Sequence, residues 1–250
     1  MNAIQLMSTR QVADRLRVSE ASVRRWSDRG VLPVQRVGRR GERRFKPEDV
    51  DGFALASRAN PPLALARIDR PQVLISGRAV PISTHIATLY DSDGARLRLT
   101  VPFLADGLRA GQPCFLIAQG AELDSYMTAL RSIPGVDVDG AIASGLLTIA
   151  GAPGSTVEAA IAYWEENLWD AVENHAPVVR AVGEMVSERE TFESEQEMLD
   201  YEAAINLTLK RFPTVVICQY DVRKFSGQAV LAALRAHPDI LDVSLGLLLK

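Results

Sequence analysis

The sequence predicts an α/β protein in which a small, basic, mainly helical N-terminal domain precedes a larger α/β domain. Short arginine-rich helical patterns fill the first 60 residues, whereas from residue 85 onward short apolar runs alternate with longer amphipathic stretches. The charge divides at the same place. Residues 1–60 carry 13 basic and 7 acidic side chains, a net +6, and the other 190 carry 15 and 24, a net −9. This asymmetry indicates one end that faces nucleic acid.

The composition excludes several classes of protein. The 250 residues are 47% hydrophobic and 24% charged, which is typical of a globular chain and not of a disordered or collagen-like one. At a guide value of about 150 residues per domain, the length allows one large or two modest domains. No apolar stretch of about 18 residues occurs, and the N-terminus lacks signal-peptide features. We therefore expect a cytoplasmic protein with no membrane partner.

Capping residues mark the first two helices of the N-terminal domain. Ser8 and Gln11 form the capping-box pattern, in which each side chain accepts from the other residue's backbone amide at a helix start. Ser19 is an N-cap candidate for the second helix. Val23 and Trp26 lie three residues apart and face the first helix, so Trp26 is expected in the core. Two short helices joined by a tight turn predict a helix-turn-helix.

Two short strands and a third helix follow. Residues 31–37 and 43–45 flank a basic tip that contains glycines, a pattern typical of a wing. The sequence Pro47-Glu48-Asp49 suits the first turn of a helix, because proline needs no amide partner there and acids favour the positive end of the helix dipole.

This order of elements resembles the MerR-type winged helix-turn-helix family over about residues 8–55. The motifs that carry the resemblance are residues 9–13, 22–26, 30–33 and 43–50. It implies binding to double-stranded DNA, with the second helix at the major groove and the wing against phosphate or a minor groove. The expected DNA-binding residues are Ser22, Arg24, Arg25, Arg29, Arg39, Arg40, Arg43 and Arg44. A single surface arginine is more often simply solvated. Seven arginines on the second helix and the wing, however, favour DNA binding.

The sequence predicts an N-terminal domain at 1–57, a linker marked by prolines at 58–82 and an α/β domain at 83–250. Whether residues 73–75 form a strand within the linker stays undecided. The five apolar runs, each long enough for a buried strand, are 85–90, 114–118, 146–149, 178–182 and 215–218. The helical patterns between and after them are 95–109, 121–132, 155–174, 193–211 and 227–235. This alternation predicts a parallel sheet with right-handed crossovers.

Polar residues follow the carboxyl ends of these predicted strands, where parallel sheets bind ligands. The candidate ligand-binding residues are Tyr90, Asp91, Arg96, Glu184, Tyr220 and Asp221. Each of the turns after these strands is, by itself, weak support for a ligand site, because ordinary turns are also rich in Gly, Asp and Ser. Glu184 has the alternative of a helix cap, and Arg96 that of a surface arginine. Glu165, Glu166 and the glutamates between 188 and 197 are expected on solvated helix faces, with a lid between Glu184 and Glu193 as the alternative.

Six motifs make a second resemblance more specific. They are residues 85–91, 101–108, 179–185, 201–206, 218–221 and 234–238. They look like the MEDS domain, a sensory domain of methanogen and methylotroph proteins, over about residues 83–245. The resemblance implies a RecA/KaiC-like α/β fold without nucleotide hydrolysis that senses a small molecule.

The residues also argue against common catalytic chemistry. The chain has no Gly-Lys pair and no lysine between Lys46 and Lys210, so it lacks the P-loop that would hold phosphates. Its three histidines are isolated, and no nucleophile motif is present. Cys114 and Cys218 stand alone in apolar runs and are expected as buried free thiols. We therefore expect no catalytic residue, no metal site and no cofactor.

The leading interpretation is a DNA-binding transcriptional regulator whose α/β domain senses a small-molecule effector and forms a homodimer. Two alternatives stay open: a small-metabolite enzyme with a DNA-binding anchor, and a protein-interaction regulator of the anti-sigma type without a ligand. The missing catalytic motifs argue against the enzyme.

Overall fold

The computed structural model describes residues 6–16, 18, 20–28, 30, 32–39, 41–58 and 71–237. The predictions for Ser19, Arg29 and Arg40 therefore lie outside the described residues. The chain divides into two units, Met1–Pro61 and Pro62–Lys250. Each is described by itself.

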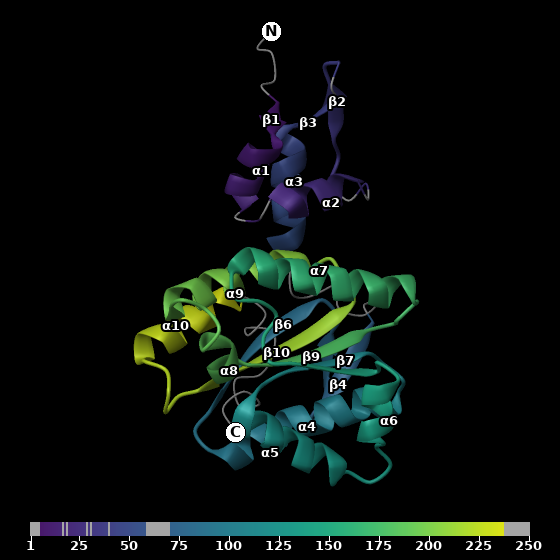
Figure 1. The fold of residues 1–250 in the computed structure, drawn as a ribbon, viewed down its shortest axis with the longest axis vertical. Coiled ribbons are helices and arrows are strands. Elements are labelled where there is room, and N and C mark those ends of the chain that lie inside the picture. Colours follow the sequence, from purple (N-terminus) through teal and green to yellow (C-terminus); the bar gives the residue numbers. More distant parts are fainter. Residues whose placement is uncertain are drawn as a thin grey trace. The chain divides into compact units, whose positions relative to one another are not determined.

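The first unit contains the predicted helix, turn, helix, wing and helix. Its elements are β1 (Met7–Ser8), α1 (Thr9–Leu16), α2 (Glu20–Asp28), β2 (Gln35–Val37), β3 (Glu42–Phe45) and α3 (Pro47–Arg58) (Figure 1). The capping box forms: the Ser8 amide donates to Gln11 Oε1 at 2.8 Å, and the Gln11 amide donates to Ser8 Oγ at 3.3 Å. Strand β1, which the sequence did not predict, joins the wing strands in the order β1-β3-β2.

Apolar side chains from every helix of this unit meet in one small core. Its buried members are Val12, Ala13, Leu16, Val23, Trp26, Leu32, Phe45, Val50 and Phe53. The ring of Trp26 lies with its centroid 4.8 Å from that of Phe53 on α3. The prediction that Trp26 is a core residue is confirmed, and the indole ties α2 to α3.

The second unit contains the predicted alternation of strands and helices. Its strands are β6 (Thr84–Tyr90), β7 (Cys114–Ile117), β8 (Leu147–Ala150), β9 (Val179–Glu184) and β10 (Thr214–Asp221). Its helices are α4 (Asp93–Arg109), α5 (Gly120–Arg131), α6 (Val138–Ala143), α7 (Val157–Glu173), α8 (Met185–Arg189), α9 (Glu195–Leu209) and α10 (Gly227–Ala236). The short helices α6 and α8 were not predicted. The five strands are all parallel, in the order β6-β10-β9-β7-β8, which confirms the expected sheet.

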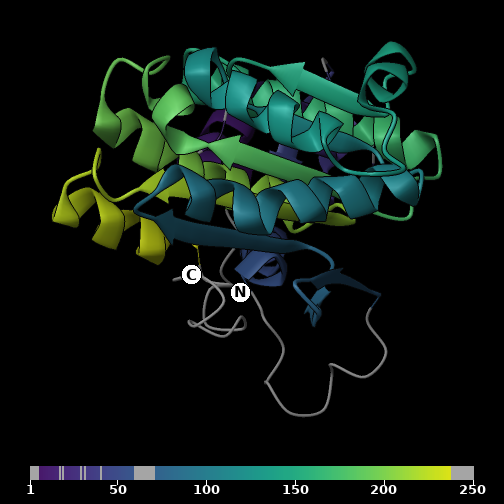
Figure 2. The same ribbon diagram turned by 90° about the horizontal axis from the view of Figure 1, so that it is seen from below.

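Helices cover both faces of this sheet. Figure 1 shows α7, α9 and α10 on one face and α4, α5 and α6 on the other. Strand β6 lies at one edge and β8 at the opposite edge (Figure 2). Strands β6, β7, β9 and β10 are buried on both faces, which explains why they are continuous apolar runs and not alternating ones.

A β-hairpin occupies the end of the segment expected as a linker. Strands β4 (Gln72–Ile75) and β5 (Arg78–Pro81) pair antiparallel, and Val73, Ile75 and Val80 are buried in the core of the α/β unit. The strand left open at 73–75 is present, and it belongs to a packed hairpin. Residues 59–70 lie outside the described part of the chain. Among the described residues, no helix is long and apolar enough to cross a membrane.

Candidate functional site

One face of α2 presents arginines to solvent while the opposite face packs into the small core. The side chain of Arg24 is 54% exposed, and its Nη2 lies 2.8 Å from Glu20 Oε2 one turn earlier. Arg25 is half-buried. The expectation that Ser22 contacts DNA is corrected, because its side chain is fully buried and does not lie at the protein surface. It stands four residues before Trp26, so both lie on the inner face of the helix.

The wing is fastened to the end of α2 by an acid. Arg43 Nη2 binds both carboxylate oxygens of Asp28, at 2.6 and 2.7 Å, and Arg43 Nε donates to Ser27 Oγ at 3.1 Å. Arg36 Nη2 also reaches Asp28 Oδ1, at 3.1 Å. The hydrogen bond from Arg43 lowers the pKa of Asp28. Arg43 therefore orients the wing relative to α2.

Charged side chains also surround a shallow hollow between the wing and the two first helices. The hollow has a volume of about 400 Å³. It is lined by Ser8, Thr9, Arg10, Glu20, Arg36, Gly41, Glu42, Arg43 and Arg44. Arg39 is exposed in the turn of the wing. Arg10 and Arg36, which the sequence analysis did not single out, join the expected arginines because the fold brings the start of α1 beside the wing.

The parallel sheet has a topological switch point between β7 and β9. The chain passes from β7 outward to β8, and from β9 in the opposite direction to β10. Such a divergence opens a crevice at the carboxyl ends of the two strands, which is the usual ligand position in α/β sheets. Gln119 follows β7, and Glu184 ends β9. Glu184 therefore lies at the end of the sheet where α/β proteins usually bind ligands.

Two tyrosines bind the carboxylate of Glu184, which is completely buried. The hydroxyl of Tyr90 on β6 donates to Glu184 Oε1 at 2.7 Å, and the hydroxyl of Tyr126 on α5 donates to Oε2 at 3.2 Å. Although Glu184 precedes α8, its side chain makes no capping hydrogen bond. Glu184 is therefore the N-cap residue of α8 by position, as the alternative held, but its carboxylate does not cap the helix and is held inside the domain.

Burial changes the protonation of this site. It raises the pKa of Glu184 from 4.5 to about 7, against the lowering effects of the Tyr90 hydrogen bond, the Arg96 charge and the Tyr126 hydrogen bond. Burial likewise raises the pKa of both tyrosines above its ordinary value, so they remain hydrogen-bond donors. Glu184 thus changes its charge near neutral pH, which suits a polar recognition group.

Arg96 and Gln219 complete the surroundings of Glu184. Arg96 is 4% exposed, and its guanidinium carbon lies 5.9 Å from the ring centre of Tyr90 and 5.6 Å from that of Tyr126. The surface-arginine alternative is therefore wrong. Gln219 Nε2 donates to Thr100 Oγ1 at 3.3 Å and to the Tyr126 hydroxyl. Tyr126 and Gln219 were not among the predicted site residues, because only the packing of α5 and β10 brings them to Glu184.

Tyr220 and Asp91 lie apart from this group, whereas Asp221 pairs with Tyr90 across β10 and β6 but is engaged by Arg223. Successive side chains on a strand point to opposite faces. Gln219 faces Tyr126, so Tyr220 faces away, with its ring centroid 6.0 Å from that of His237. Asp221 accepts from Arg223 Nε at 2.8 Å and Nη2 at 2.7 Å, and Asp91 is exposed. Of the six candidates, the structure joins Tyr90, Arg96 and Glu184.

Two further expectations about side chains have clear outcomes. Glu165 and Glu188, both expected on solvated helix faces, are buried. Glu188 is buried because the short helix α8 packs against β9 and β10. Its burial raises its pKa well above the ordinary value. Both cysteines are buried and free, as predicted.

Comparisons with known proteins match both parts of the chain. Residues 84–238 match the MEDS family, described as the methanogen/methylotroph, DcmR sensory domain. Residues 6–58 match a helix-turn-helix domain family. The finer assignment of this domain to the MerR type stays a prediction. The chain is 37% identical over 242 residues to the transcriptional repressor DcmR of Methylorubrum extorquens (strain DSM 6343 / CIP 106787 / DM4), covering 94% of this chain and 91% of that protein.

Two solved structures share a distant likeness. The flagellar accessory protein FlaH of Methanocaldococcus jannaschii aligns with a TM-score of 0.43 at 9% identity, over 63% of this chain and 70% of that one. A KaiC-like protein of Pyrococcus horikoshii OT3 aligns with a TM-score of 0.45 at 15% identity, over 66% and 72%.

Proposed function

Because this chain belongs to the MEDS family and carries a helix-turn-helix domain at its N-terminus, we propose that it is a DNA-binding transcriptional regulator. Its relative is named a transcriptional repressor, and we propose repression for this chain as well. The observation that carries the proposal is the arrangement of α2 and the wing, where exposed arginines stand on two elements that Asp28 holds in one orientation.

Arg24 is the residue we assign to base edges in the major groove. It lies on the outer face of α2, and a guanidinium makes bidentate contacts to guanine. Arg25 lies beside it. Arg36, Arg39 and Arg44 on the wing are assigned to phosphates, because a basic hairpin can follow a backbone without reading sequence. Arg43 has the positioning role that its bonds to Asp28 indicate. Arg29 and Arg40, which lie outside the described residues, remain assigned to DNA from their sequence positions.

A homodimer is part of this proposal. A domain of this size offers few base contacts, so useful specificity calls for two copies on a two-fold related operator. The α/β domain is the part that we propose to self-associate.

We further propose that Glu184 and its neighbours bind a small polar effector. Both carboxylate oxygens are engaged by phenols, so an effector with a hydrogen-bond donor would replace Tyr90 or Tyr126 and thereby shift β6 or α5. Such a shift changes DNA binding only if the effector has different affinities for the two arrangements of the dimer. We favour a sensor over the enzyme alternative, because the relative that matches 94% of this chain is named a transcriptional repressor.

The DNA assignment is tested with operators selected from a random duplex library, followed by binding titrations at several salt concentrations. We expect Arg24→Ala to weaken binding and to relax preference at about one base pair, at a cost of about 1–3 kcal/mol. Arg15→Ala is the matched control: Arg15 is 50% exposed and ion-paired to Asp51 at 2.7 Å, but it lies on α1. Unchanged affinity and sequence preference in Arg24→Ala would refute the groove assignment.

The effector and the dimer are tested separately. A thermal-shift screen of small alcohols and amines should find a compound that stabilises the wild type by mass action but not Glu184→Gln. A compound that stabilises both proteins equally binds elsewhere. Sedimentation equilibrium of the full chain should give twice the chain mass of 27.3 kDa, and a monomer at all concentrations would remove the dimer from the proposal.

A further inference from the structure

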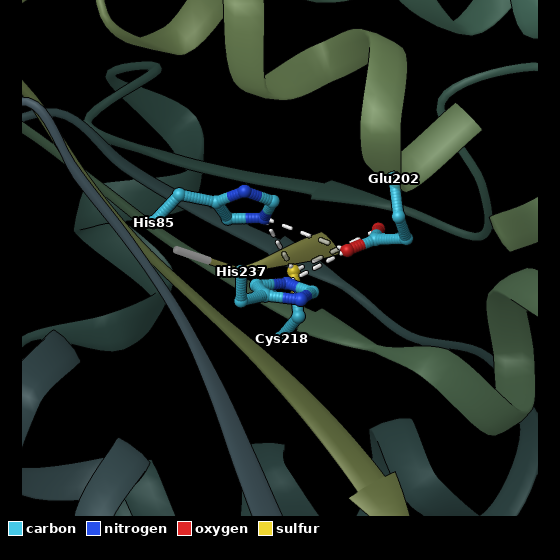
Figure 3. Close-up of side chains that lie close together, drawn as sticks. All are labelled: His85, Glu202, Cys218 and His237. Atoms are coloured by element: carbon cyan, nitrogen blue, oxygen red, sulfur yellow. Dashed lines mark hydrogen bonds and ion pairs between the residues drawn. The ribbon is translucent and has the colours of Figure 1, made fainter. Parts of the chain in front are cut away.

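Four side chains from four different elements meet inside the α/β domain, on the opposite sheet face from Glu184. They are His85 on β6, Glu202 on α9, Cys218 on β10 and His237 at the end of α10 (Figure 3). We call them the buried cluster. Each is at most 4% exposed. Their nearest donor atoms all lie within 4.8 Å of one another, and no other group of this kind occurs in the part of the chain that the structure describes.

Sheet register explains how residues so distant in sequence converge. Cys218 pairs with Ala87, two residues beyond His85, so both side chains project from the same face of neighbouring strands. Helices α9 and α10 cover that face and contribute the other two groups. The resulting contacts are 3.2 Å between His85 Nε2 and Cys218 Sγ, and 3.5 Å between His85 Nε2 and Glu202 Oε2.

The contact between His237 and Glu202 calls for a positive charge at this place in the cluster. Its Nδ1 lies 2.7 Å from the carbonyl oxygen of Ala233, which can only accept, so Nδ1 carries a proton. In the neutral imidazole this leaves a lone pair on Nε2, which stands 2.8 Å from Glu202 Oε2. Neither atom has a hydrogen-bond partner. Two lone pairs this close, and away from water, require a cation between or beside them.

A single proton between His237 and Glu202 would satisfy only that contact, whereas a metal ion would bind all four side chains of the cluster. Ligands around a tetrahedral Zn²⁺ with bonds of 2.0–2.3 Å lie roughly 3.3–3.8 Å apart. The close contacts of the cluster run from 2.8 Å, between His237 Nε2 and Glu202 Oε2, to 3.8 Å, between Cys218 Sγ and Glu202 Oε1. All four donor groups lie within 4.8 Å of one another, so small side-chain movements would bring them around one ion. The bond from His237 Nδ1 to a backbone carbonyl is also the outer contact that metal-binding histidines usually make.

We propose that the buried cluster binds one divalent transition-metal ion, with Zn²⁺ as the occupant that its donor set fits best. Two imidazole nitrogens, one sulfur and one carboxylate oxygen suit zinc, whereas Mg²⁺ and Ca²⁺ prefer oxygen alone. Four protein ligands close the coordination sphere, which is the pattern of a structural site. The ion would fasten α9 and α10 to the strands at the β6 edge of the sheet.

The first experiment measures metal in the wild-type full chain. Protein expressed with zinc supplementation should contain about one zinc per chain by mass spectrometry of the elements. Protein expressed in zinc-depleted medium with Co²⁺ should show the visible bands of a tetrahedral cobalt site and a near-ultraviolet sulfur-to-cobalt charge-transfer band. These measurements need no variant, so they hold even if a substitution prevents folding.

The second experiment identifies the ligands. Cys218→Ala should abolish the charge-transfer band, whereas Cys114→Ala should retain it, because Cys114 is an equally buried free cysteine outside the cluster. His237→Ala should weaken zinc binding, measured by competition with a chromophoric chelator, by more than the 10–100-fold that is typical for loss of an outer contact. His175→Asn is its control, since His175 is exposed and its φ of 58° is tolerated by asparagine.

Three results would overturn the proposal: less than about a tenth of an equivalent of zinc in the wild type, a cobalt spectrum without the sulfur band, or loss of that band in Cys114→Ala as well. The cluster would then be a proton-sharing polar network of the core. None of these outcomes bears on DNA binding by the first domain, so this proposal and the proposed function are tested independently.

Discussion

The phenol of Tyr90 donates a 2.7 Å hydrogen bond to the buried carboxylate of Glu184, 94 residues later in the chain. The bond joins the edge strand β6 to β9 at the switch point of the sheet, across the intervening strand β10. It joins two of the predicted ligand-binding residues, of which Glu184 titrates near neutral pH. The pH dependence of stability follows from it.

Glu184→Gln should flatten the dependence of the unfolding free energy on pH. Burial raises the folded-state pKa of Glu184 from 4.5 to about 7. Its favourable contribution is therefore complete below pH 4.5 and is lost as the pH rises to 7, because the unfolded state releases its proton first. The loss is on the order of 3 kcal/mol. Urea unfolding across this range measures it, with the exposed Glu166→Gln as control. Equal pH slopes in wild type and Glu184→Gln would contradict the prediction.

Tyr90→Phe should raise the pKa of Glu184 further, because the lost hydrogen bond favours the ionised carboxylate. We also expect a loss of about 1–3 kcal/mol at neutral pH, since one carboxylate oxygen is left without a donor. Carbon-13 NMR of labelled glutamate carboxyls reads the titration directly. Tyr163→Phe is the matched control, because the buried Tyr163 hydroxyl makes no hydrogen bond. A titration that moves to lower pH would show that Tyr90 does not stabilise the charge.

Arg39→Ala should reduce the salt dependence of DNA binding without changing sequence preference. Arg39 is exposed in the wing turn, and loss of one phosphate contact lowers the slope of log K against log salt by about 0.9. Titrations of the selected operator at several salt concentrations measure the slope. Arg131→Ala, which removes a 54% exposed arginine from the α/β domain, should leave it unchanged. A changed base preference in Arg39→Ala would move this residue from phosphate to base contact.

Phe53→Ala should unfold or loosen the DNA-binding domain while leaving the α/β domain folded. The Phe53 ring is 6% exposed and lies 4.8 Å from that of Trp26, and truncation of such a core phenylalanine costs about 3–5 kcal/mol. Hydrogen exchange measures the protection of the backbone amides in each domain separately. Val37→Ala is a wing control, because Val37 is 44% exposed. Retained amide protection in residues 9–28 of Phe53→Ala would show that the small core does not depend on this ring pair.

Local patterns were enough to predict most elements of the fold. The capping box at Ser8 marked the start of α1, and the three-residue spacing of Val23 and Trp26 indicated the buried face of α2. Apolar runs marked all five strands of the parallel sheet. The short helix α8 was missed because its five residues contain too little periodicity, and its buried Glu188 looks like a solvated charge in sequence.

The sequence by itself determined the two-domain order, the basic first domain, the parallel α/β class and Glu184 at a strand end. These depend on residues close together in the chain, where periodicity and capping act. Only the tertiary structure decided that Tyr126 and Gln219 meet Glu184 while Tyr220 turns away, and that His85 and Cys218 lie 3.2 Å apart across 133 residues. The physical reason is strand register together with helix packing. Register fixes which residues of neighbouring strands share a face, packing fixes which helix covers that face, and no short sequence pattern records either pairing.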